Sequence, residues 1–387
     1  MKILHAFSNW KWTGPAEPAV RLAESLLARH SVDFACGFCP YPDLENLVES
    51  AARAAGLELV TGLRLRKHFD PVTGVRDLAK LTRRVQSRGY DVVHTHLLND
   101  HLLAGAAARR AGKSSIVVRS VYGGPDLSPR FRTALVFRRL TDGVFAASSA
   151  AAEVVRTRTN IAEERLFVIR GAVDANRFRP DALSALRDQA RREFGFGPDD
   201  VVAGLVARIQ RHRRFDLLLE AFSAAVLKEP RLRLLLIGRG THQDELVGAP
   251  VRRLGLEEKV LLSGYREGEQ FLALLAALDL GLFLVPGSDG SCRAARELAA
   301  ASLPMIVTRR PPLPEIVEHG SNGWVVEEQV GELAGALASL AADPALRKAM
   351  GLASRSRAER LFSLEHQAEE VERAYERLLS LGIAGAR

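Results

Sequence analysis

The sequence has few cysteines and no hydrophobic run long enough to cross a membrane. Only three cysteines occur in 387 residues, at positions 36, 39 and 292, which argues against the disulfide framework of small secreted proteins. The longest apolar run, residues 271–285, is interrupted by Asp279 and falls short of the roughly 20 residues that a membrane span requires. The first residues turn polar too quickly for a secretory signal. These absences favour a cytoplasmic, soluble protein.

The pair Cys36 and Cys39 has the spacing of a thioredoxin-like redox motif. In a redox centre such a motif begins a helix, whereas here it follows a predicted strand and precedes Pro40 and Pro42. No second cysteine pair completes a zinc site. We therefore interpret the spacing as incidental.

Positive charge is concentrated in the first half of the chain. The net charge is +8, and residues 1–180 hold 27 Lys and Arg against 17 Asp and Glu, with the excess between Arg64 and Arg139. A basic face attracts an anionic membrane, a phosphorylated acceptor or nucleic acid. A solvated, arginine-rich surface has the same composition, so both interpretations stay open here.

Predicted strands and helices alternate along the chain in two separate blocks. The first block has strands at residues 2–7, 32–36, 90–94, 115–119 and 143–147, and helices at 15–29 and 101–111. The second has strands at 201–206, 232–238, 260–264, 280–285 and 305–307, and a helix at 215–227. Such alternation predicts parallel sheets flanked by helices, and two blocks predict two doubly wound α/β domains facing across a cleft.

Two carboxylates, Asp289 and Glu297, follow the predicted strand at 280–285 within a Gly-bearing turn and the helix after it. This is the usual frame for a site at the carboxyl ends of parallel strands. Eight residues of helix separate two groups by roughly 12 Å. That distance is too long for the carboxylate pair of a retaining glycosidase, about 5 Å apart. It suits the two ends of one long ligand, such as a sugar joined to a nucleoside through a diphosphate.

Seven further patterns occur in order along nearly the whole chain, at residues 12–17, 91–96, 168–180, 207–216, 237–240, 288–307 and 314–323. Together they resemble the motifs of the family 4 glycosyltransferases. The segment 207–216, for example, resembles the family's Gly-Arg-Leu…Lys-Gly motif, and 288–297 resembles its Glu-x7-Glu segment. No single pattern is specific, but their order and spacing are.

The resemblance implies the GT-B fold, with two Rossmann-like parallel-sheet domains. Residues 1–180 would form the acceptor-side domain and residues 181–363 the nucleotide-sugar-binding domain, with a C-terminal helix at 364–387 packing back toward the first. It implies a retaining, hexosyl-type transferase that moves a sugar from a nucleoside diphosphate, UDP or GDP, to a hydroxyl acceptor. The acceptor would be a glycan, a glycolipid or a polysaccharide precursor. No metal or other cofactor and no nucleic-acid partner is expected.

The resemblance also assigns roles on the donor side. Arg208 and Arg213 match the family's Arg and Lys, and both would bind the diphosphate, because fixed cations stabilise the charge that develops on the leaving group. Asp289 matches the carboxylate beside the sugar, and Glu297 matches the one that accepts hydrogen bonds from the ribose. The alternative is that the arginines belong to a basic surface loop and the acids to a turn and a solvated helix face.

Further donor-binding candidates surround these four residues: Gly14, Tyr265, Arg266, Gly290, Ser291 and Cys292. The backbone amides of residues 290–292 would open the helix, where N–H groups favour anionic ligands. Tyr265 and Arg266 are placed to pack on the nucleobase, although partial burial at a strand end explains Tyr265 equally well. Gly14 lies in the turn after the first strand.

On the acceptor side, Tyr122 stands where the family often has a His beside the reacting sugar. A tyrosine donates a hydrogen bond to a sugar hydroxyl but is a poor acid–base group near neutrality. His94 and His96 are expected at a strand end near the cleft mouth, as sugar contacts or as packed side chains. With His101 they suggest a metal, but Asp100 is the only carboxylate that accompanies them.

Several positions depart from the family pattern. Asp289 is one methylene shorter than the usual Glu, Ser291 and Cys292 replace Phe-Gly, Arg214 replaces a Gly, and Pro15 removes one backbone amide. These departures motivate an alternative function, a degenerate relative that binds a nucleotide sugar or glycan without turnover. A third alternative is a sugar-phosphate epimerase of similar shape.

A predicted helix at residues 72–88 combines an apolar stripe with cations. The stripe consists of Val72, Val75, Leu78, Leu81 and Val85, and the cations are Arg76, Lys80, Arg83, Arg84 and Arg88. Either this helix, within the basic region 64–139, touches the inner face of an anionic membrane, or its stripe packs on the sheet and its cations lie in water.

Overall fold

The computed structural model of the chain describes residues 1–68, 70–112, 115–123, 127, 130–287 and 292–385. These residues form two compact units. The first contains Met1–Gly171 and helix α15 (Leu364–Gly385), and the second contains Ala172–Gly287 and Cys292–Ser363. The chain leaves the first unit at Gly171 rather than at residue 180, because Val173 and Phe178 are buried in the core of the second unit.

The first unit is built on a seven-stranded parallel sheet in the order β3-β2-β1-β4-β5-β6-β7. Its strands are β1 (Lys2–Phe7), β2 (Ser31–Cys36), β3 (Glu58–Leu59), β4 (Val92–Thr95), β5 (Ile116–Val121), β6 (Gly143–Ala146) and β7 (Leu166–Val168). Its helices besides α15 are α1 (Ala16–Leu26), α2 (Leu47–Ala54), α3 (Pro71–Arg88), α4 (Leu98–Arg110), α5 (Arg130–Leu140) and α6 (Ser149–Arg158).

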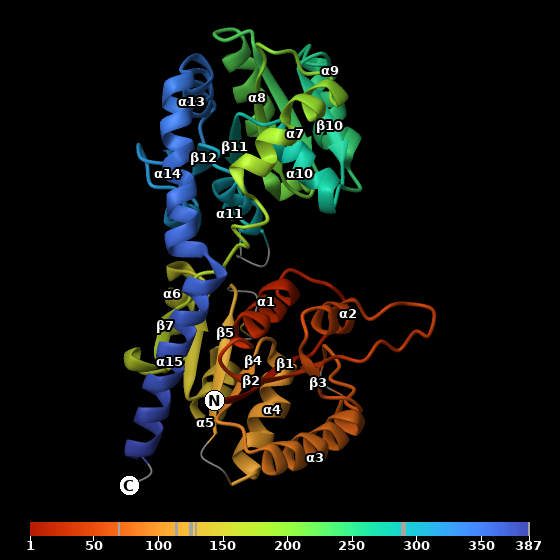
Figure 1. Cartoon of the computed structure of the whole chain (residues 1–387), viewed down its shortest axis with the longest axis vertical. Helices are drawn as coiled ribbons and strands as arrows, with labels where there is room; N and C mark the ends of the chain where they lie inside the picture. The colour runs from red at the N-terminus through yellow and green to blue at the C-terminus, as the bar shows by residue number, and fades with distance from the viewer. Residues whose placement is uncertain (69, 113–114, 124–126, 128–129, 288–291, 386–387) are drawn as a thin grey trace. The chain divides into compact units, whose positions relative to one another are not determined.

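Strand β1 shows why this sheet is covered on both faces. Ile3 and Phe7 pack with apolar residues of α1 and α15, whereas Leu4 and Ala6 pack with those of α3 and α4. Helix α15 therefore completes the core of the first unit although it lies at the other end of the sequence (Figure 1). A parallel strand buried on both faces reads as a continuous apolar run, as the 2–7 segment does.

The second unit is built on a six-stranded parallel sheet in the order β10-β9-β8-β11-β12-β13. Its strands are β8 (Val201–Val206), β9 (Leu232–Ile237), β10 (Val260–Gly264), β11 (Leu280–Phe283), β12 (Met305–Thr308) and β13 (Gly323–Val326). Its helices are α7 (Pro180–Glu193), α8 (Phe215–Val226), α9 (Ala249–Arg253), α10 (Gly268–Ala276), α11 (Arg293–Ala300), α12 (Leu313–Ile316), α13 (Val330–Ala342) and α14 (Pro344–Phe362). Leu205 faces the cluster formed with α8 and α13, and Val202 faces the one formed with α7, α10 and α11.

The alternation predicted from the sequence is confirmed, with shifts at element ends. Helix α4 begins at Leu98, before the expected residue 101, because the carboxylate of Asp100 accepts the N–H of Leu97 at 2.8 Å and caps the first turn. Strand β5 continues to Val121, two residues past the predicted end, and so brings Ser120 into the sheet. The ends of helices and strands depend on capping residues and on partner strands, and hydrophobic periodicity gives no information about either.

Helix α3 differs from the expected amphipathic stripe. Leu81 and Val85 are buried, but Val72 and Val75 are each 70% exposed. The helix is capped by Asp70 and ends at Gly89 in the left-handed conformation (φ 65°). Among the described helices none is long and apolar enough to cross a membrane.

Two residues that replace glycines of the family pattern have left-handed backbones. Arg214, which precedes α8, has φ 58°, and Cys292, which precedes α11, has φ 47°. A non-glycine residue in this conformation costs roughly 1–2 kcal/mol. The Arg214 side chain is held by ion pairs with Asp216 and Glu328, and Cys292 is buried in the core of the second unit. The backbone therefore keeps the glycine-like conformation without the glycine.

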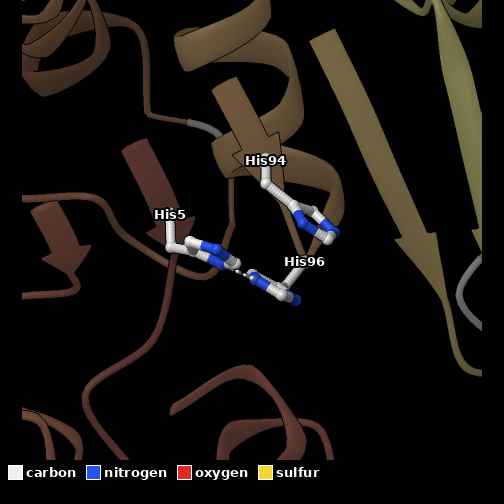
Figure 2. Close-up of side chains that lie close together, drawn as sticks. All are labelled: His5, His94 and His96. Atoms are coloured by element: carbon white, nitrogen blue, oxygen red, sulfur yellow. Dashed lines mark hydrogen bonds between the residues drawn. The ribbon is translucent and has the colours of Figure 1, made fainter. Parts of the chain in front are cut away.

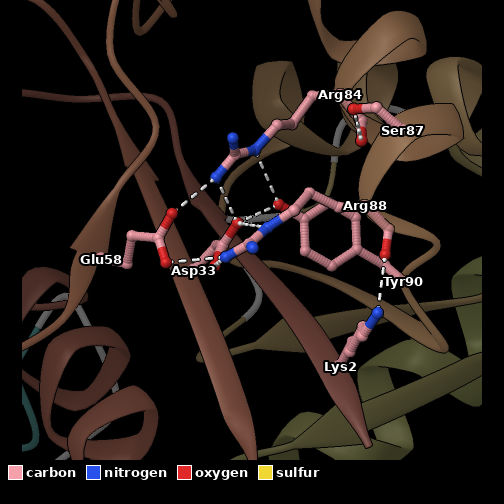
Figure 3. Close-up of polar contacts among 7 residues, drawn as sticks. All are labelled: Lys2, Asp33, Glu58, Arg84, Ser87, Arg88 and Tyr90. Atoms are coloured by element: carbon pink, nitrogen blue, oxygen red, sulfur yellow. Dashed lines mark hydrogen bonds and ion pairs between the residues drawn. The ribbon is translucent and has the colours of Figure 1, made fainter.

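A charged cluster fastens α3 to the edge of the first sheet (Figure 3). The buried carboxylate of Asp33 on β2 accepts hydrogen bonds from Arg84 at 2.6 Å, from Arg88 at 3.0 Å and from the hydroxyl of Tyr90. Both arginines also pair with Glu58, at 3.0 and 2.7 Å. Burial alone would raise the pKa of Asp33, but the hydrogen bonds from Arg88, Tyr90 and Arg84 outweigh it and hold this pKa below its usual value.

Replacing Asp33 with Asn is expected to lower the free energy of unfolding by about 2–3 kcal/mol at pH 7, because the arginines lose a buried charged partner. Since the folded-state pKa is depressed, the contribution exists above the unfolded pKa of about 3.9 and disappears as the pH falls through the folded value. Urea unfolding at pH 7 and pH 3 measures this. A difference between wild type and variant that does not shrink at pH 3 would contradict it, and Tyr90→Phe serves as the milder control.

Replacing Arg214 with Gly is expected to leave the protein about 1 kcal/mol more stable than replacing it with Ala. Both variants lose the same ion pairs, so their difference isolates the left-handed backbone. Urea unfolding of the two variants side by side makes the comparison. An alanine variant as stable as the glycine variant would show that the backbone relaxes without strain.

Candidate functional site

Backbone packing at the carboxyl ends of β8 and β9 positions the loop that carries Arg208. The N–H of Ile209 donates to the carbonyl of Arg239 at 3.1 Å, so the loops after the two strands touch. A Cβ on Gly238 would lie 2.0 Å from the carbonyl oxygen of Ala207, and one on Gly240 would lie 1.9 Å from that of Ile209. Glycine is therefore required at both positions. The two glycines of the 237–240 pattern therefore leave room for the loop after β8.

The two arginines of the β8 loop have different surroundings. Arg208 is exposed and makes no hydrogen bond or ion pair with any residue that the structure describes. Arg213 is half-buried, and its Nη1 donates to the carbonyl of Val285 at 2.7 Å. Strand order reverses between β8 and β11, so this hydrogen bond joins the loops that follow the two strands at the switch point, where ligands of such sheets bind.

Glu297 lies on α11, and its side chain is buried, with 7% of the residue exposed. This excludes the solvated helix residue that the sequence left as an alternative. Burial raises the pKa of Glu297, and the charges of Arg293, Arg177 and Arg296 partly offset that effect. The Nε of Arg293 lies 3.5 Å from the carboxylate. A carboxylate in these surroundings is well suited to accept hydrogen bonds from a ligand.

Five of the remaining donor-side candidates lie in the segment 289–292 and at Gly14. Asp289, Gly290 and Ser291 lie outside the described residues, so the expected separation of the two acids stays a prediction. Cys292 is buried at the N-terminus of α11, and Gly14 is exposed in the turn before α1.

Tyr265 and Arg266 follow β10 on the surface of the second unit. Tyr265 is 51% exposed, and its hydroxyl donates to Glu267. The guanidinium of Arg239 lies over its ring, 5.0 Å from the centroid. Sequence reasoning missed Arg239, although the turn between Gly238 and Gly240 was its signal. The strands β8, β9 and β10 are neighbours in the sheet, and Arg208, Arg239 and Tyr265 come after their carboxyl ends.

His94 and His96 of the first unit are packed side chains, which is one of the two possibilities that the sequence left open. His94 and His96 are fully buried, as is Tyr122 apart from 6% of its surface. His5 joins them, because β1 and β4 pair in a register that places it opposite His94 (Figure 2). His5 escaped the sequence analysis, since strand register is not visible in a single sequence.

Hydrogen bonds connect these buried side chains in two short chains. Nδ1 of His5 lies 3.0 Å from Nε2 of His96, and Nδ1 of His96 lies 2.8 Å from the hydroxyl of Tyr122. His94 contacts the hydroxyls of Tyr375 and Ser120, at 2.5 and 2.8 Å. Burial lowers the pKa of His5 to about 3 and holds those of His94 and His96 well below the usual value. All three imidazoles are therefore neutral.

The three imidazoles do not converge as metal ligands do. One ligand nitrogen from each lies within 4.8 Å of the others, but the rings of His94 and His96 stack at 15° with centroids 4.6 Å apart. Lone pairs of imidazole lie in the ring plane, so nearly parallel rings cannot point at one ion. Both nitrogens of His94 are also engaged by hydroxyls. The cluster is a hydrogen-bonded network, and His101 belongs to a separate one with Thr95 and Thr141.

Asp100 holds the start of the loop that follows β1. Its carboxylate accepts the N–H of Ser8 at 2.9 Å and lies 3.6 Å from the buried guanidinium of Arg119. Burial raises the pKa of Asp100 to about 7. The charge of Arg119 and hydrogen bonds from the backbone N–H groups of Ser8, Leu97 and His101 partly offset this effect. Asp100 is thus a structural anchor of the loop and not a metal ligand.

Two family models match this chain, one in each half. The family described as glycosyl transferases group 1 matches residues 187–357, and the one described as Glycosyltransferase Family 4 matches residues 14–177. D-inositol 3-phosphate glycosyltransferase of Corynebacterium jeikeium is 30% identical over 57% of this chain and 54% of its own. Mannosylfructose-phosphate synthase of Agrobacterium fabrum is 29% identical over 49% of this chain and 43% of its own. The chain thus spans about half the length of these curated relatives.

Solved structures agree over almost the whole chain. Anabaena Alr3699/HepE in complex with UDP superposes with a TM-score of 0.79 at 18% identity, covering 97% of this chain and 100% of that one. A glycosyltransferase from Rickettsia africae superposes with a TM-score of 0.81 at 14% identity, covering 98% of each chain. These likenesses show the GT-B fold, with two Rossmann-like parallel-sheet halves. With both family models matched in order, the chain belongs to the family 4 glycosyltransferases.

Proposed function

We propose that this protein transfers a sugar from a nucleoside-diphosphate donor to a hydroxyl acceptor. The observation that carries the proposal is the arrangement of Arg208, Arg213 and the buried Glu297 on elements that follow β8 and β11, at the switch point of a family 4 chain. Two cations and a carboxylate at such a point match the diphosphate and the ribose of a nucleotide sugar. The second unit would hold the donor and the first unit the acceptor.

The chemistry follows from the charges. Breaking the bond between sugar and phosphate places negative charge on the leaving diphosphate, which Arg208 and Arg213 would stabilise without a metal. Glu297 would accept hydrogen bonds from the ribose, and Tyr265 with Arg239 would offer a flat cationic face to the base. The acceptor hydroxyl would attack from the side that the leaving group occupies, with retention, and the leaving phosphate would take its proton.

Donor and acceptor identities rest on the relatives. The structural neighbour HepE binds UDP and UDP-glucose, which favours a UDP-hexose over the GDP alternative. One curated relative is named a D-inositol 3-phosphate glycosyltransferase and another a mannosylfructose-phosphate synthase. A phosphorylated polyol or sugar therefore joins glycans, glycolipids and polysaccharide precursors as an acceptor class. We place the reaction in the cytoplasm and expect no nucleic-acid partner.

Acceptor-dependent release of nucleoside diphosphate tests the function. Arg208→Ala and Glu297→Gln are each expected to lower kcat/KM by about 100-fold or more, because each removes a charged contact to the donor. Arg253→Ala, which changes an exposed arginine of α9 in the same unit, is the matched control and should be unchanged. Excess EDTA should leave the rate unaltered, and NMR of the product should show the donor's anomeric configuration.

Two outcomes of that assay would contradict the transferase function, and a third would contradict only the metal-free mechanism. Donor binding without release across a broad acceptor panel would favour the degenerate, binding-only relative. Turnover that needs no acceptor would favour an epimerase. A rate abolished by EDTA and restored by a divalent cation would remove the metal-free mechanism while leaving the transferase.

We also infer peripheral contact with an anionic membrane through the start of α3, within the basic region 64–139. Val72 and Val75 are each 70% exposed beside the exposed Arg76. Arg84 and Arg88 are engaged by Asp33 and so do not contribute. Apolar and cationic side chains on one exposed helical turn suit the surface of an anionic bilayer, and a lipid-linked acceptor would lie there.

The double variant Val72→Asp/Val75→Asp is expected to cosediment with phosphatidylglycerol vesicles about tenfold less or weaker still, because it removes apolar contacts and adds negative charge. Leu227→Asp, at another exposed apolar residue (85% exposed) in the second unit, is the control. If both variants bind the vesicles as well as wild type does, or if wild type does not bind them, the start of α3 is not a membrane-binding surface.

A further inference from the structure

Two parallel ion pairs join the chain just after β12 and β13. The two strands pair in parallel, and the two residues that follow each of them lie side by side. Arg309 contacts Glu327 at 2.5 Å, and Arg310 donates from Nε and Nη2 to the two carboxylate oxygens of Glu328, with a distance of 2.6 Å for Nη2. A bidentate pair of this kind fixes the orientation of the carboxylate as well as its place.

Glu328 also contacts Arg214, on the loop between β8 and α8. Nη1 of Arg214 donates to Oε2 of Glu328 at 2.5 Å, and the same oxygen accepts Nη2 of Arg310. Hydrogen bonds from Arg310, with the charges of Arg310 and Arg214, outweigh the effect of burial and hold the pKa of Glu328 below its usual value. The carboxylate is therefore ionised near neutral pH. Strands β11 and β12 lie between β8 and β13 in the sheet, so this contact crosses the switch point.

The contact with Glu328 fixes a turn that carries a donor-site candidate. Arg214 is the single residue between the 3₁₀ turn Arg211–Arg213 and α8. Arg213 donates to the carbonyl of Val285, so two consecutive arginines fasten this turn, one to the loop after β11 and the other to the chain after β13. The family pattern has a glycine in place of Arg214, and glycine has no side chain that could reach Glu328. The fastening to Glu328 is therefore a feature of this chain.

We propose that Glu328 is a positioning residue of the donor site, which holds Arg214 and thereby keeps the turn that carries Arg213 in place for the donor diphosphate. This inference rests on the proposed transferase function. A binding group that is fixed in advance loses less conformational entropy when the ligand arrives, which strengthens binding without a new contact. Arg310 contributes indirectly, because it anchors the carboxylate of Glu328 beside β12.

A double-mutant cycle on UDP binding tests this role. Glu328→Ala and Arg214→Gly are each expected to weaken UDP binding about fivefold to tenfold, because each removes the same contact. The double variant should bind UDP no more weakly than either single variant, since Glu328 acts through Arg214. Glycine is used at position 214 because it adopts the left-handed backbone without strain. Isothermal titration calorimetry measures the dissociation constants.

Binding of uridine separates positioning from a general loss of structure. Uridine carries the base and the ribose but no phosphate, so its affinity should be the same in wild type and in all three variants. The ratio of UDP affinity to uridine affinity should therefore fall about fivefold to tenfold. A fall in both affinities by the same factor, or a double variant whose loss is the product of the two single losses, would overturn the proposal. If wild type binds guanine nucleotides only, GDP and guanosine take the place of these probes.

Glu327→Ala is the matched control. Glu327 is the neighbouring acid, and it pairs with Arg309 instead of Arg214. Its replacement should leave UDP affinity unchanged, whatever it does to the melting temperature. An equal loss of UDP affinity in this variant would show that any ion pair after β12 and β13 has the same effect, and would contradict a specific role of Glu328.

Hydrogen exchange of the ligand-free protein separates this inference from the transferase function. Peptides that cover residues 209–214 should exchange faster in Glu328→Ala and Arg214→Gly than in wild type and in Glu327→Ala. Unchanged exchange of this segment, or unchanged UDP affinity, would refute the positioning role even if the enzyme is active. If exchange rises as expected but wild type neither binds a nucleoside diphosphate nor releases one, the proposed function is wrong, and the role of Glu328 in donor binding falls with it.

Discussion

The reversal of strand order between β8 and β11 is the constraint on which the candidate donor site depends. Loops that leave neighbouring parallel strands in opposite directions leave room at the sheet edge. Here the hydrogen bond from Arg213 to Val285 joins the two loops at that point. On the other side of β8, Gly238 and Gly240 let the turn after β9 lie against residues 207–209. The backbone packing of this loop positions Arg208, whose side chain makes no ion pair within the described part of the chain.

The first sheet also has a reversal of strand order, but different side chains lie beside it. Strand order reverses there between β1 and β4, but His5, His94 and His96 fill the space beside these strands. Burial keeps their rings neutral, so the network costs no desolvated charge and is held by hydrogen bonds to Tyr122, Ser120 and α15. One unit presents fixed cations to its surroundings, and the other encloses neutral dipoles. This contrast fits the proposal that the second unit holds the diphosphate of the donor.

Periodicity and turn residues predict most of the strands along the chain but miss the short strands β3, β7 and β13. Motif spacing predicts Arg213 and Glu297 as candidates. What they missed depends on partners distant in sequence. His5 joins His94 through strand register, Tyr375 reaches His94 from α15, and Arg239 covers Tyr265 from the next strand. Val72 and Val75 have the right helical spacing to be buried, yet α3 meets the sheet only further along. Burial is a property of the assembled unit, so a single sequence cannot supply it.

The departures from the family pattern bear on whether the donor site is retained. A lost glycine usually signals a changed backbone, because only glycine takes the left-handed conformation freely. Arg214 and Cys292 nevertheless keep that conformation. Each is held by a different means, Arg214 by ion pairs with Asp216 and Glu328 and Cys292 by burial in the core. A degenerating site would be expected to relax such strain rather than maintain it. At both positions the backbone therefore has the left-handed conformation that a glycine would adopt, with a side chain that a glycine lacks.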